Sequence, residues 1–192
     1  NPTDVSADAQ IQRMKAAAPQ AIITSVSGTP LGTILRALRN AAWDVPMTVP
    51  ESNMLLAQMK QYEGITPKLM YDATGDWLAA SRADHPDAVK AQKEKMFAAF
   101  KTAGVIPDEA AGLPWDPALI AVAALNALPE DASPQQVRDY IAGLSGFAGT
   151  LGTYDFKQVP QRGIGLDGVV IALWNAKDNY WSVVSHPGGA PF

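Results

Sequence analysis

The chain has 192 residues, of which 47% are hydrophobic and 18% charged, and this composition supports one or two globular domains with a sizeable core. Its net charge of -4 comes without a block of like charges, so we expect neither nucleic acid nor an anionic membrane surface as a partner. Cysteine is absent, which excludes disulfides, thiolate metal sites and cysteine nucleophiles.

The first part of the chain predicts an alternation of helices and strands. Apolar residues recur at helical spacing, and segment 21–24 is a short β-favouring run of the kind that a parallel sheet buries. Pro30 suits the first position of a helix. We therefore expect an α/β fold with a parallel sheet flanked by helices, with helices at 6–18, 30–42 and 53–62 and strands at 21–24, 45–49 and 68–72.

The middle of the chain replaces this alternation with three helices in a row. The first begins after Pro86 and ends at Gly104, the second covers 117–128, and the third runs from the cap Ser133 to about Gly143. Strands are expected at 153–156, 169–174 and 180–184, and the turn-like composition of 175–179 predicts an antiparallel hairpin between the last two. The change of pattern indicates that the chain leaves one sheet to pack on another.

Three stretches of the chain, in this order, carry a family likeness. Segment 3–6 (Thr-Asp-Val-Ser) and the residues up to 23 match a TDFS turn that leads to a strand. Segment 115–117 (Trp-Asp-Pro) matches the start of a YDA helix, with Trp for the usual Tyr. Segment 147–156, followed by Arg162-Gly163, matches an F-G-x-x-G-x-x-x-F pattern. Together they resemble the type I periplasmic solute-binding proteins of branched-chain amino-acid ABC transporters.

That resemblance implies two α/β lobes joined by three crossings, and this chain matches only the C-terminal part. Residues 1–78 would be part of the ligand-binding second lobe, residues 79–148 a helical segment that packs on the first lobe, and residues 149–192 the hinge return and terminal strands. The implied partners are a small-molecule ligand, the membrane permease of an ABC transporter, and the missing N-terminal half of the receptor. The implied location is periplasmic. The first residues carry no secretion signal, which we expect to have been removed or to lie upstream.

A candidate binding loop lies between the first expected strand and the helix after it. Ser25, Ser27, Gly28 and Thr29 bring hydroxyls and backbone N–H groups to a positive helix end, a geometry that suits a carboxylate. The alternative is that Ser27 and Thr29 only cap the helix and that Gly28 only turns the chain. The family resemblance, in which the matching loop contacts ligand, favours binding.

Glu51 and Trp77 are two further candidates. Glu51 follows the next strand, at the sheet edge that faces a cleft in open α/β sheets, and a carboxylate there suits an ammonium group. Pro50-Glu51 also resembles a dipeptide of the family's amino-acid binders. The alternative for Glu51 is a solvated carboxylate near a helix start. Trp77 lies near the expected hinge as a candidate pocket wall, with core packing as its alternative.

Other sites are not supported by the sequence. Segment 163–168 has the spacing of a dinucleotide-binding glycine motif, but it lacks the strand before and the helix after, so we interpret it as a turn into a strand. The two histidines, His85 and His186, are far apart and lack acidic partners at metal spacing. Neither serine of the loop has the full nucleophile-elbow motif, which argues against a hydrolase.

The resulting hypothesis is a receptor of an ABC importer that binds an amino acid between two lobes, without catalysis, cofactor or metal. Two alternatives stay open: a binder of aromatic or aliphatic carboxylic acids, and an amide-sensing regulator with the same fold but no role in transport. For the isolated chain we also expect exposed apolar positions such as Val89, Met96, Phe97 and Phe100.

Overall fold

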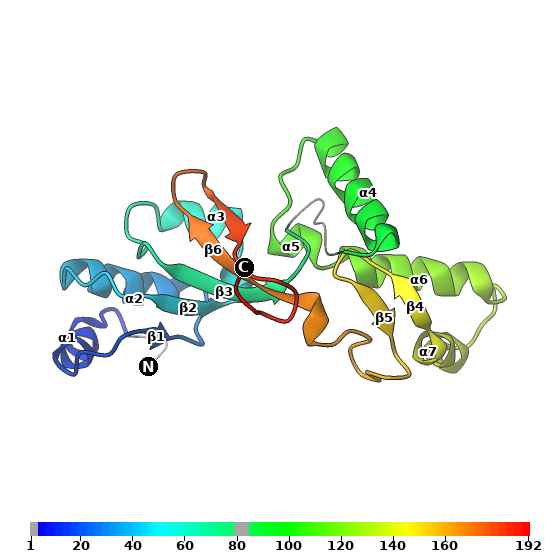
Figure 1. The fold of residues 1–192 in the computed structure, drawn as a ribbon, viewed down its shortest axis with the longest axis horizontal. Helices are drawn as coiled ribbons and strands as arrows, with labels where there is room; N and C mark the ends of the chain where they lie inside the picture. The colour runs from blue at the N-terminus through cyan, green and yellow to red at the C-terminus, as the bar shows by residue number, and fades with distance from the viewer. Residues whose placement is uncertain (1–3, 79–84) are drawn as a thin grey trace. The chain divides into compact units, whose positions relative to one another are not determined.

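The computed structural model describes residues 4–78 and 85–192 and divides the chain into two compact units (Figure 1). The first unit comprises Asn1–Thr74 and Ile171–Val184, and the second comprises Gly75–Val170 and Ser185–Phe192. The chain therefore passes between the units three times, directly after Thr74, Val170 and Val184.

A five-stranded sheet with strand order β1-β2-β3-β6-β7 is the centre of the first unit. The pairs β1–β2 and β2–β3 are parallel, with Ile22 opposite Met47 and Met47 opposite Met70. The hairpin β6–β7 is antiparallel, with Trp174 opposite Trp181. The elements of this unit are α1 (Asp8–Ala16), β1 (Ile22–Ile23), α2 (Thr29–Asn40), β2 (Met47–Pro50), the 3-10 helix η1 (Glu51–Asn53), α3 (Leu56–Gln61), β3 (Met70–Gly75), β6 (Val169–Asn175) and β7 (Tyr180–Val183), of which Gly75, Val169 and Val170 belong to the second unit.

The parallel pairing of the first strands and the antiparallel final hairpin confirm the predictions from the sequence pattern. The helix expected at 53–62 is wrong at its start, because η1 and two further residues precede α3. Asn53 explains the interruption. Its amide group donates to the carbonyl oxygens of Val26 and Pro50, both at 3.0 Å, and such side-chain bonds to the backbone compete with helix formation.

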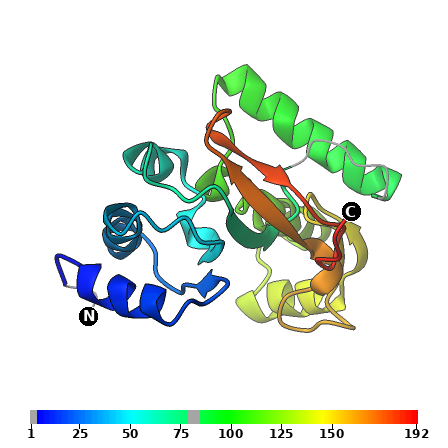
Figure 2. The same cartoon turned by 60° about the vertical axis from the view of Figure 1, so that its left-hand side comes forward.

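One face of the sheet is covered by α2. Leu31, Leu35 and Leu38 recur at helical spacing and are at most 1% exposed. Fully burying each leucine stabilises the fold by about 1.5–3 kcal/mol. Because β1, β2 and β3 are adjacent in chain order and parallel, right-handed crossovers place α2 and α3 on the same face. Figure 2 shows both helices along one side of the strands.

Gly32 allows α2 and α3 to approach closely. A Cβ atom at this position would lie 2.8 Å from Cε1 of Tyr62. The ring cannot easily swing away, because the Tyr62 hydroxyl donates a 2.6 Å hydrogen bond to the carbonyl of Gly28. Burial raises the pKa of Tyr62 above its ordinary value.

We expect Gly32→Ala to lower the free energy of unfolding by about 1–3 kcal/mol, because the added methyl overpacks this contact. Urea unfolding followed by circular dichroism measures the effect. Gly143→Ala is the matched control, since a Cβ atom there meets nothing within 4 Å. Equal stabilities for the two variants would contradict the packing argument.

The second unit is mainly helical, with α6 packed against α7 and α4 against β4. Its small sheet pairs β4 and β5 antiparallel, with an irregularity between Ser145 and Phe147 at the positive-φ residue Gly146. The elements are α4 (Asp87–Ala103), α5 (Glu109–Gly112), α6 (Trp115–Ala127), α7 (Pro134–Gly143), β4 (Ser145–Ala148), β5 (Thr153–Asp155) and the 3-10 helix η2 (Leu166–Gly168).

Three predictions for this unit have a clear outcome. The helices and the capping residue Ser133 are confirmed, and Ser133 and Gln136 form a reciprocal capping box. Segment 163–168 leads through η2 into β6, as the interpretation as a turn into a strand requires. The expected exposure of Val89 and Met96 is wrong, because both are at most 1% exposed, and Phe97 and Phe100 are half-buried.

Candidate functional site

The carboxyl ends of β1, β2 and β3 meet at one edge of the sheet, where open α/β proteins bind their ligands. Three predicted features of the sequence reach this edge: the 24–28 loop after β1, the start of α2, and Glu51 directly after β2. The sheet topology therefore brings together Ser25, Ser27, Gly28, Thr29 and Glu51.

The loop after β1 presents its hydroxyl side chains to solvent. Ser25, Ser27 and Thr29 are exposed, and Gly28 is half-buried with a φ of 65°. Gly28 occupies the N-cap position of α2, and no side chain caps this helix end. The alternative interpretation, in which Ser27 or Thr29 caps the helix, therefore finds no support in the hydrogen bonds of α2. An uncapped helix start with neighbouring hydroxyls has the donors that a carboxylate requires.

Asn53 connects the two halves of this site. The side chain is 1% exposed, and its Oδ1 accepts hydrogen bonds from the Gly28 amide at 3.3 Å and from Gln58 Nε2 at 2.8 Å. Its Nδ2 donates to the carbonyls of Val26 and Pro50, so one amide group fixes the loops after β1 and β2 to each other. Asn53 was not predicted from the sequence, because its role depends on the loops that it joins and not on a local pattern.

Glu51 is held in place from the neighbouring strand. The hydroxyl of Thr74, at the end of β3, donates to Glu51 Oε1. Thr74 is 1% exposed, whereas Glu51 is half-buried. A carboxylate that is oriented in this way differs from a freely solvated surface glutamate. Thr74 was not predicted, since the sequence gives no sign that its side chain reaches across to β2.

Trp77 lies in the second unit and has no exposed surface. It packs on Gly112, where a Cβ atom would come within 2.6 Å of the indole ring. This environment matches the core-packing alternative. The candidate site of the first unit therefore does not include Trp77.

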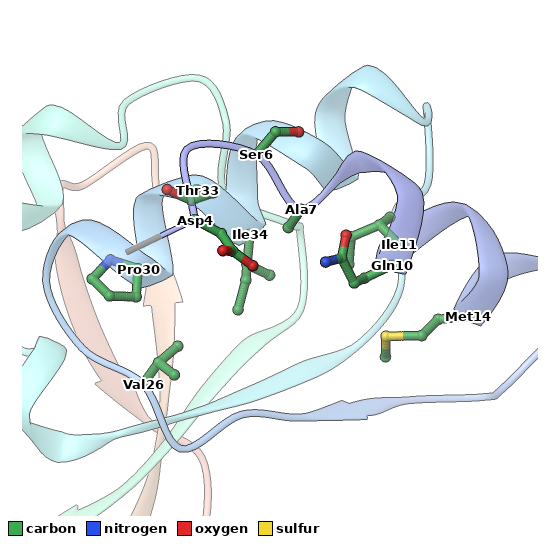
Figure 3. A pocket seen from close by; sticks show the side chains of 10 residues that line it. All are labelled: Asp4, Ser6, Ala7, Gln10, Ile11, Met14, Val26, Pro30, Thr33 and Ile34. Carbon is green, nitrogen blue, oxygen red and sulfur yellow. The ribbon is translucent and has the colours of Figure 1, made fainter. Parts of the chain in front are cut away.

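Two hollows of the first unit lie close to these loops. The first, of about 310 Å³, lies between α1 and α2 (Figure 3), and its lining combines the polar residues Asp4, Ser6, Gln10 and Thr33 with apolar side chains. The second, of about 460 Å³, lies between the start of α2 and α3 and shares Gly28 and Thr29 with the candidate loop. It also contains Arg36 and the Tyr62 ring.

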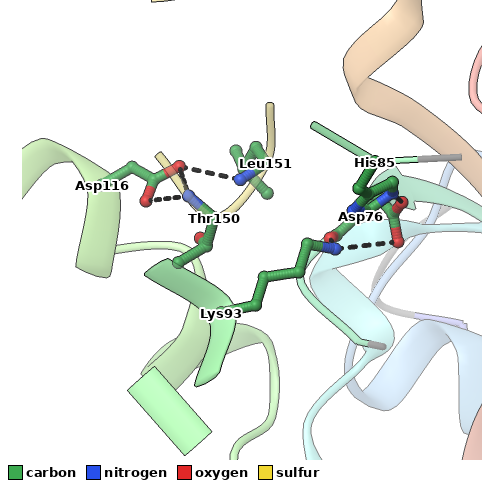
Figure 4. A network of polar contacts seen from close by, with 6 residues as sticks. All are labelled: Asp76, His85, Lys93, Asp116, Thr150 and Leu151. Atoms are coloured by element: carbon green, nitrogen blue, oxygen red, sulfur yellow. Dashed lines mark hydrogen bonds and ion pairs between the residues drawn. The ribbon is translucent and has the colours of Figure 1, made fainter. Parts of the chain in front are cut away.

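Asp116 organises a buried network in the second unit (Figure 4). Its carboxylate is not exposed and accepts hydrogen bonds from the amides of Thr150, at 2.7 and 2.9 Å, and Leu151, at 2.9 Å. The Tyr154 hydroxyl donates to the same group at 3.0 Å. Burial, followed by the negative charge of Asp116, raises the pKa of Tyr154 well above its usual range. The Trp-Asp-Pro segment thus fastens the start of α6 to the glycine-rich loop before β5.

We expect Asp116→Asn to lower the free energy of unfolding of the second unit by about 1.5–3 kcal/mol, because an amide cannot accept all these charge-assisted bonds. Chemical unfolding measures the loss. The pKa of Tyr154 should fall in this variant, since the neighbouring charge is gone while burial remains. Asp139→Asn on the exposed face of α7 is the control and should change stability little.

A second buried network in the same unit consists of Asp76, His85 and Lys93 (Figure 4). Lys93 Nζ lies 3.3 Å from Asp76 Oδ1, and His85 Nε2 lies 2.5 Å from Asp76 Oδ2. Lys93 Nζ also donates to the backbone carbonyl of Asp76. The sequence did not predict this cluster, because its members are spread over the stretch from the end of β3 into α4.

The described residues contain no group of three or more His, Asp or Glu side chains placed to hold a metal ion. Among the helices in ranges 4–78 and 85–192, none combines the length and the hydropathy that a membrane span requires.

Comparison with known proteins identifies solved structures that share this fold. No protein-family model matches the sequence, and no curated protein matches it either. Solved structures do match, among them an extracellular ligand-binding receptor from Rhodopseudomonas palustris HaA2 (19% identity, TM-score 0.72), with 95% of this chain and 52% of that one covered. A leucine-binding protein from Thermotoga maritima matches at 14% identity and a TM-score of 0.73, with 94% and 48% covered.

A type 1 periplasmic binding protein from Bordetella pertussis also matches, at 21% identity and a TM-score of 0.68, with 95% of this chain and 50% of that one covered. The chain spans about half the length of the solved structures that it matches. Identities this low establish the fold alone. The chain has the α/β fold of type I periplasmic binding proteins, over a part that corresponds to half of such a receptor.

Proposed function

We propose that this chain is the C-terminal part of an extracytoplasmic solute-binding receptor that delivers an amino acid to the permease of an ABC importer. The observation that carries the proposal is the sheet edge where the uncapped start of α2, with Ser27 and Thr29, is joined through Asn53 to the loop that holds Glu51. Binding between two lobes, and not chemistry, is the proposed activity.

The two parts of this edge suit the two charged groups of an amino acid. Backbone N–H groups at the start of α2 and the hydroxyls of Ser25, Ser27 and Thr29 are donors for the carboxylate. Glu51, oriented by Thr74, is the acceptor for the ammonium group. A neighbour in fold that is described as a leucine-binding protein supports an aliphatic amino acid as the ligand.

The rest of the pocket belongs, in this proposal, to the missing N-terminal half of the receptor. Residues 1–78 form part of the second lobe, 79–148 the helical segment that packs on the first lobe, and 149–192 the hinge return and terminal strands. The three passages of the chain between the two units support a two-lobed receptor with three crossings, although the first unit ends at Thr74 and takes back Ile171–Val184.

Exposed apolar residues in each unit support the proposal that another part of the receptor covers them. Parallel sheets are normally covered on both faces, yet only one face of this sheet carries α2 and α3. On the opposite face Ile23 is 86% exposed, and Thr48 and Ala73 are also exposed. In the second unit α6 leaves Val122 and Leu125 more than half exposed.

Calorimetric titration of the intact receptor tests the ligand class. Leucine, isoleucine and valine should bind, while the matching carboxylic acids without an amino group should bind much more weakly because Glu51 would then face no cation. Equal or tighter binding of the deaminated acids would replace the proposed ligand by a carboxylic acid. Binding of an amide but not of amino acids would favour the amide-sensing regulator.

A further inference from the structure

Three ionisable side chains are buried together at the point where the chain leaves the first unit. Asp76 and Lys93 are at most 1% exposed, and His85 is 8% exposed. The cluster belongs to the second unit, whereas the residues of the proposed ligand site belong to the first. Buried charges are expensive to desolvate and contribute little to stability when compared with apolar residues of the same size. The benefit of this cluster is therefore expected in the geometry that it imposes on the surrounding backbone, and not in stability.

The backbone around this cluster connects all three segments that pass between the units. Asp76 follows the first passage by two residues, and its amide donates to the carbonyl of Gly168 at 3.2 Å. Gly168 lies just before the second passage, which follows Val170. The amide of Gly188, just after the third passage, donates to the carbonyl of Val169 at 2.8 Å. The ends of the three segments on the second-unit side are thus joined by hydrogen bonds.

Lys93 in α4 and His85 just before α4 both contact Asp76. Lys93 Nζ contacts both the carboxylate and the backbone carbonyl of Asp76, so it fixes the peptide that follows the first passage. His85 Nε2 holds the second carboxylate oxygen. Without Lys93, the Asp76 backbone would lose the hydrogen bond to its carbonyl and would keep, of the bonds described above, the one from its amide to Gly168.

We propose that Asp76, His85 and Lys93 form a hinge anchor, which makes the three passages act as one pivot when the receptor opens and closes. This inference rests on the proposed function, in which two lobes close around a ligand. The three residues are positioning residues. They set the freedom of one unit relative to the other and do not touch the ligand.

Distance measurements between two spin labels test the anchor in the 192-residue chain, with Ile23→Lys and Leu125→Lys present in every variant so that the exposed apolar side chains do not drive self-association. Because the chain has no cysteine, Arg39→Cys on α2 and Arg138→Cys on α7 provide one exposed label in each unit. Dilution with unlabelled protein suppresses distances between molecules. Lys93→Met should broaden the distance distribution, since the pivot loses its ion pair and its bond to the Asp76 carbonyl.

Two further variants separate an effect on the motion between the units from a general loss of stability. Asp76→Asn combined with Lys93→Met removes both charges together, so it should unfold less easily than Lys93→Met alone but keep the broad distribution. Asp116→Asn disturbs the other buried network of the same unit and should leave the distribution as narrow as in the parent. A parent-like width in the double variant, or equal broadening by Asp116→Asn, would overturn the anchor.

The labels report on the anchor without any ligand. Broadening by Lys93→Met and by the double variant, combined with failure of the intact receptor to bind amino acids, would therefore retain the anchor and reject the proposed ligand. Amino-acid binding combined with unchanged distributions would reject the anchor alone.

Discussion

Replacing Glu51 by alanine in the intact receptor should weaken amino-acid binding by about 2–5 kcal/mol, because a desolvated ammonium group would lose its charged partner. Thr74 already orients the carboxylate in this structure, so little has to be rearranged when the ligand arrives. Isothermal titration of leucine into parent and variant measures the change. The affinity of the carboxylic acid without the amino group should not fall.

Two variants sharpen this experiment. Thr74→Val keeps the shape of the side chain but removes the hydroxyl that donates to Glu51, and it should weaken binding by about 0.5–1.5 kcal/mol. Glu63→Ala removes an exposed carboxylate elsewhere in the first unit and should leave the affinity unchanged. An unaltered affinity in Glu51→Ala would mean that Glu51 is only a surface carboxylate.

The sheet of the first unit was predictable because its strands are short apolar runs between well-marked helices. The apolar runs around Ile22 and Val49 predicted β1 and β2, and the leucine spacing after Pro30 predicted α2. The expected turn at 175–179 gave the final hairpin. β4 was missed, since Ser145-Gly146 reads as a loop and the strand contains an irregularity at this glycine.

The candidate site was predictable only in part. Strand ends identified the loop at Ser27 and the position of Glu51, because the edge of a parallel sheet can be inferred from chain order. Asn53 and Thr74 were not predicted, since their roles depend on which neighbours lie across the sheet and not on local pattern. The same reason applies to Lys93. Its spacing places it on the same face of α4 as Val89 and Met96, but no local pattern shows that its buried partner Asp76 lies opposite.

The 192-residue chain alone should bind amino acids weakly or not at all, because in the proposed receptor half of the pocket lies on the missing segment. A small ligand needs an opposing wall to bury its surface, and the edge around Glu51 supplies only one wall. Titration of the isolated chain with leucine, isoleucine and valine measures this loss. Binding in the micromolar range or tighter would show that the chain is self-sufficient.

The same uncovered surfaces should make the isolated chain self-associate. β1 is an edge strand with Ile23 exposed, and α6 exposes Val122 and Leu125, so copies of the chain can cover one another. Light scattering should therefore detect oligomers. Ile23→Lys combined with Leu125→Lys should shift the chain toward monomer, whereas Leu166→Lys, at an exposed leucine of η2, should not. A monomeric parent chain, or equal effects of the paired and control variants, would contradict the proposal that a missing half covers these faces.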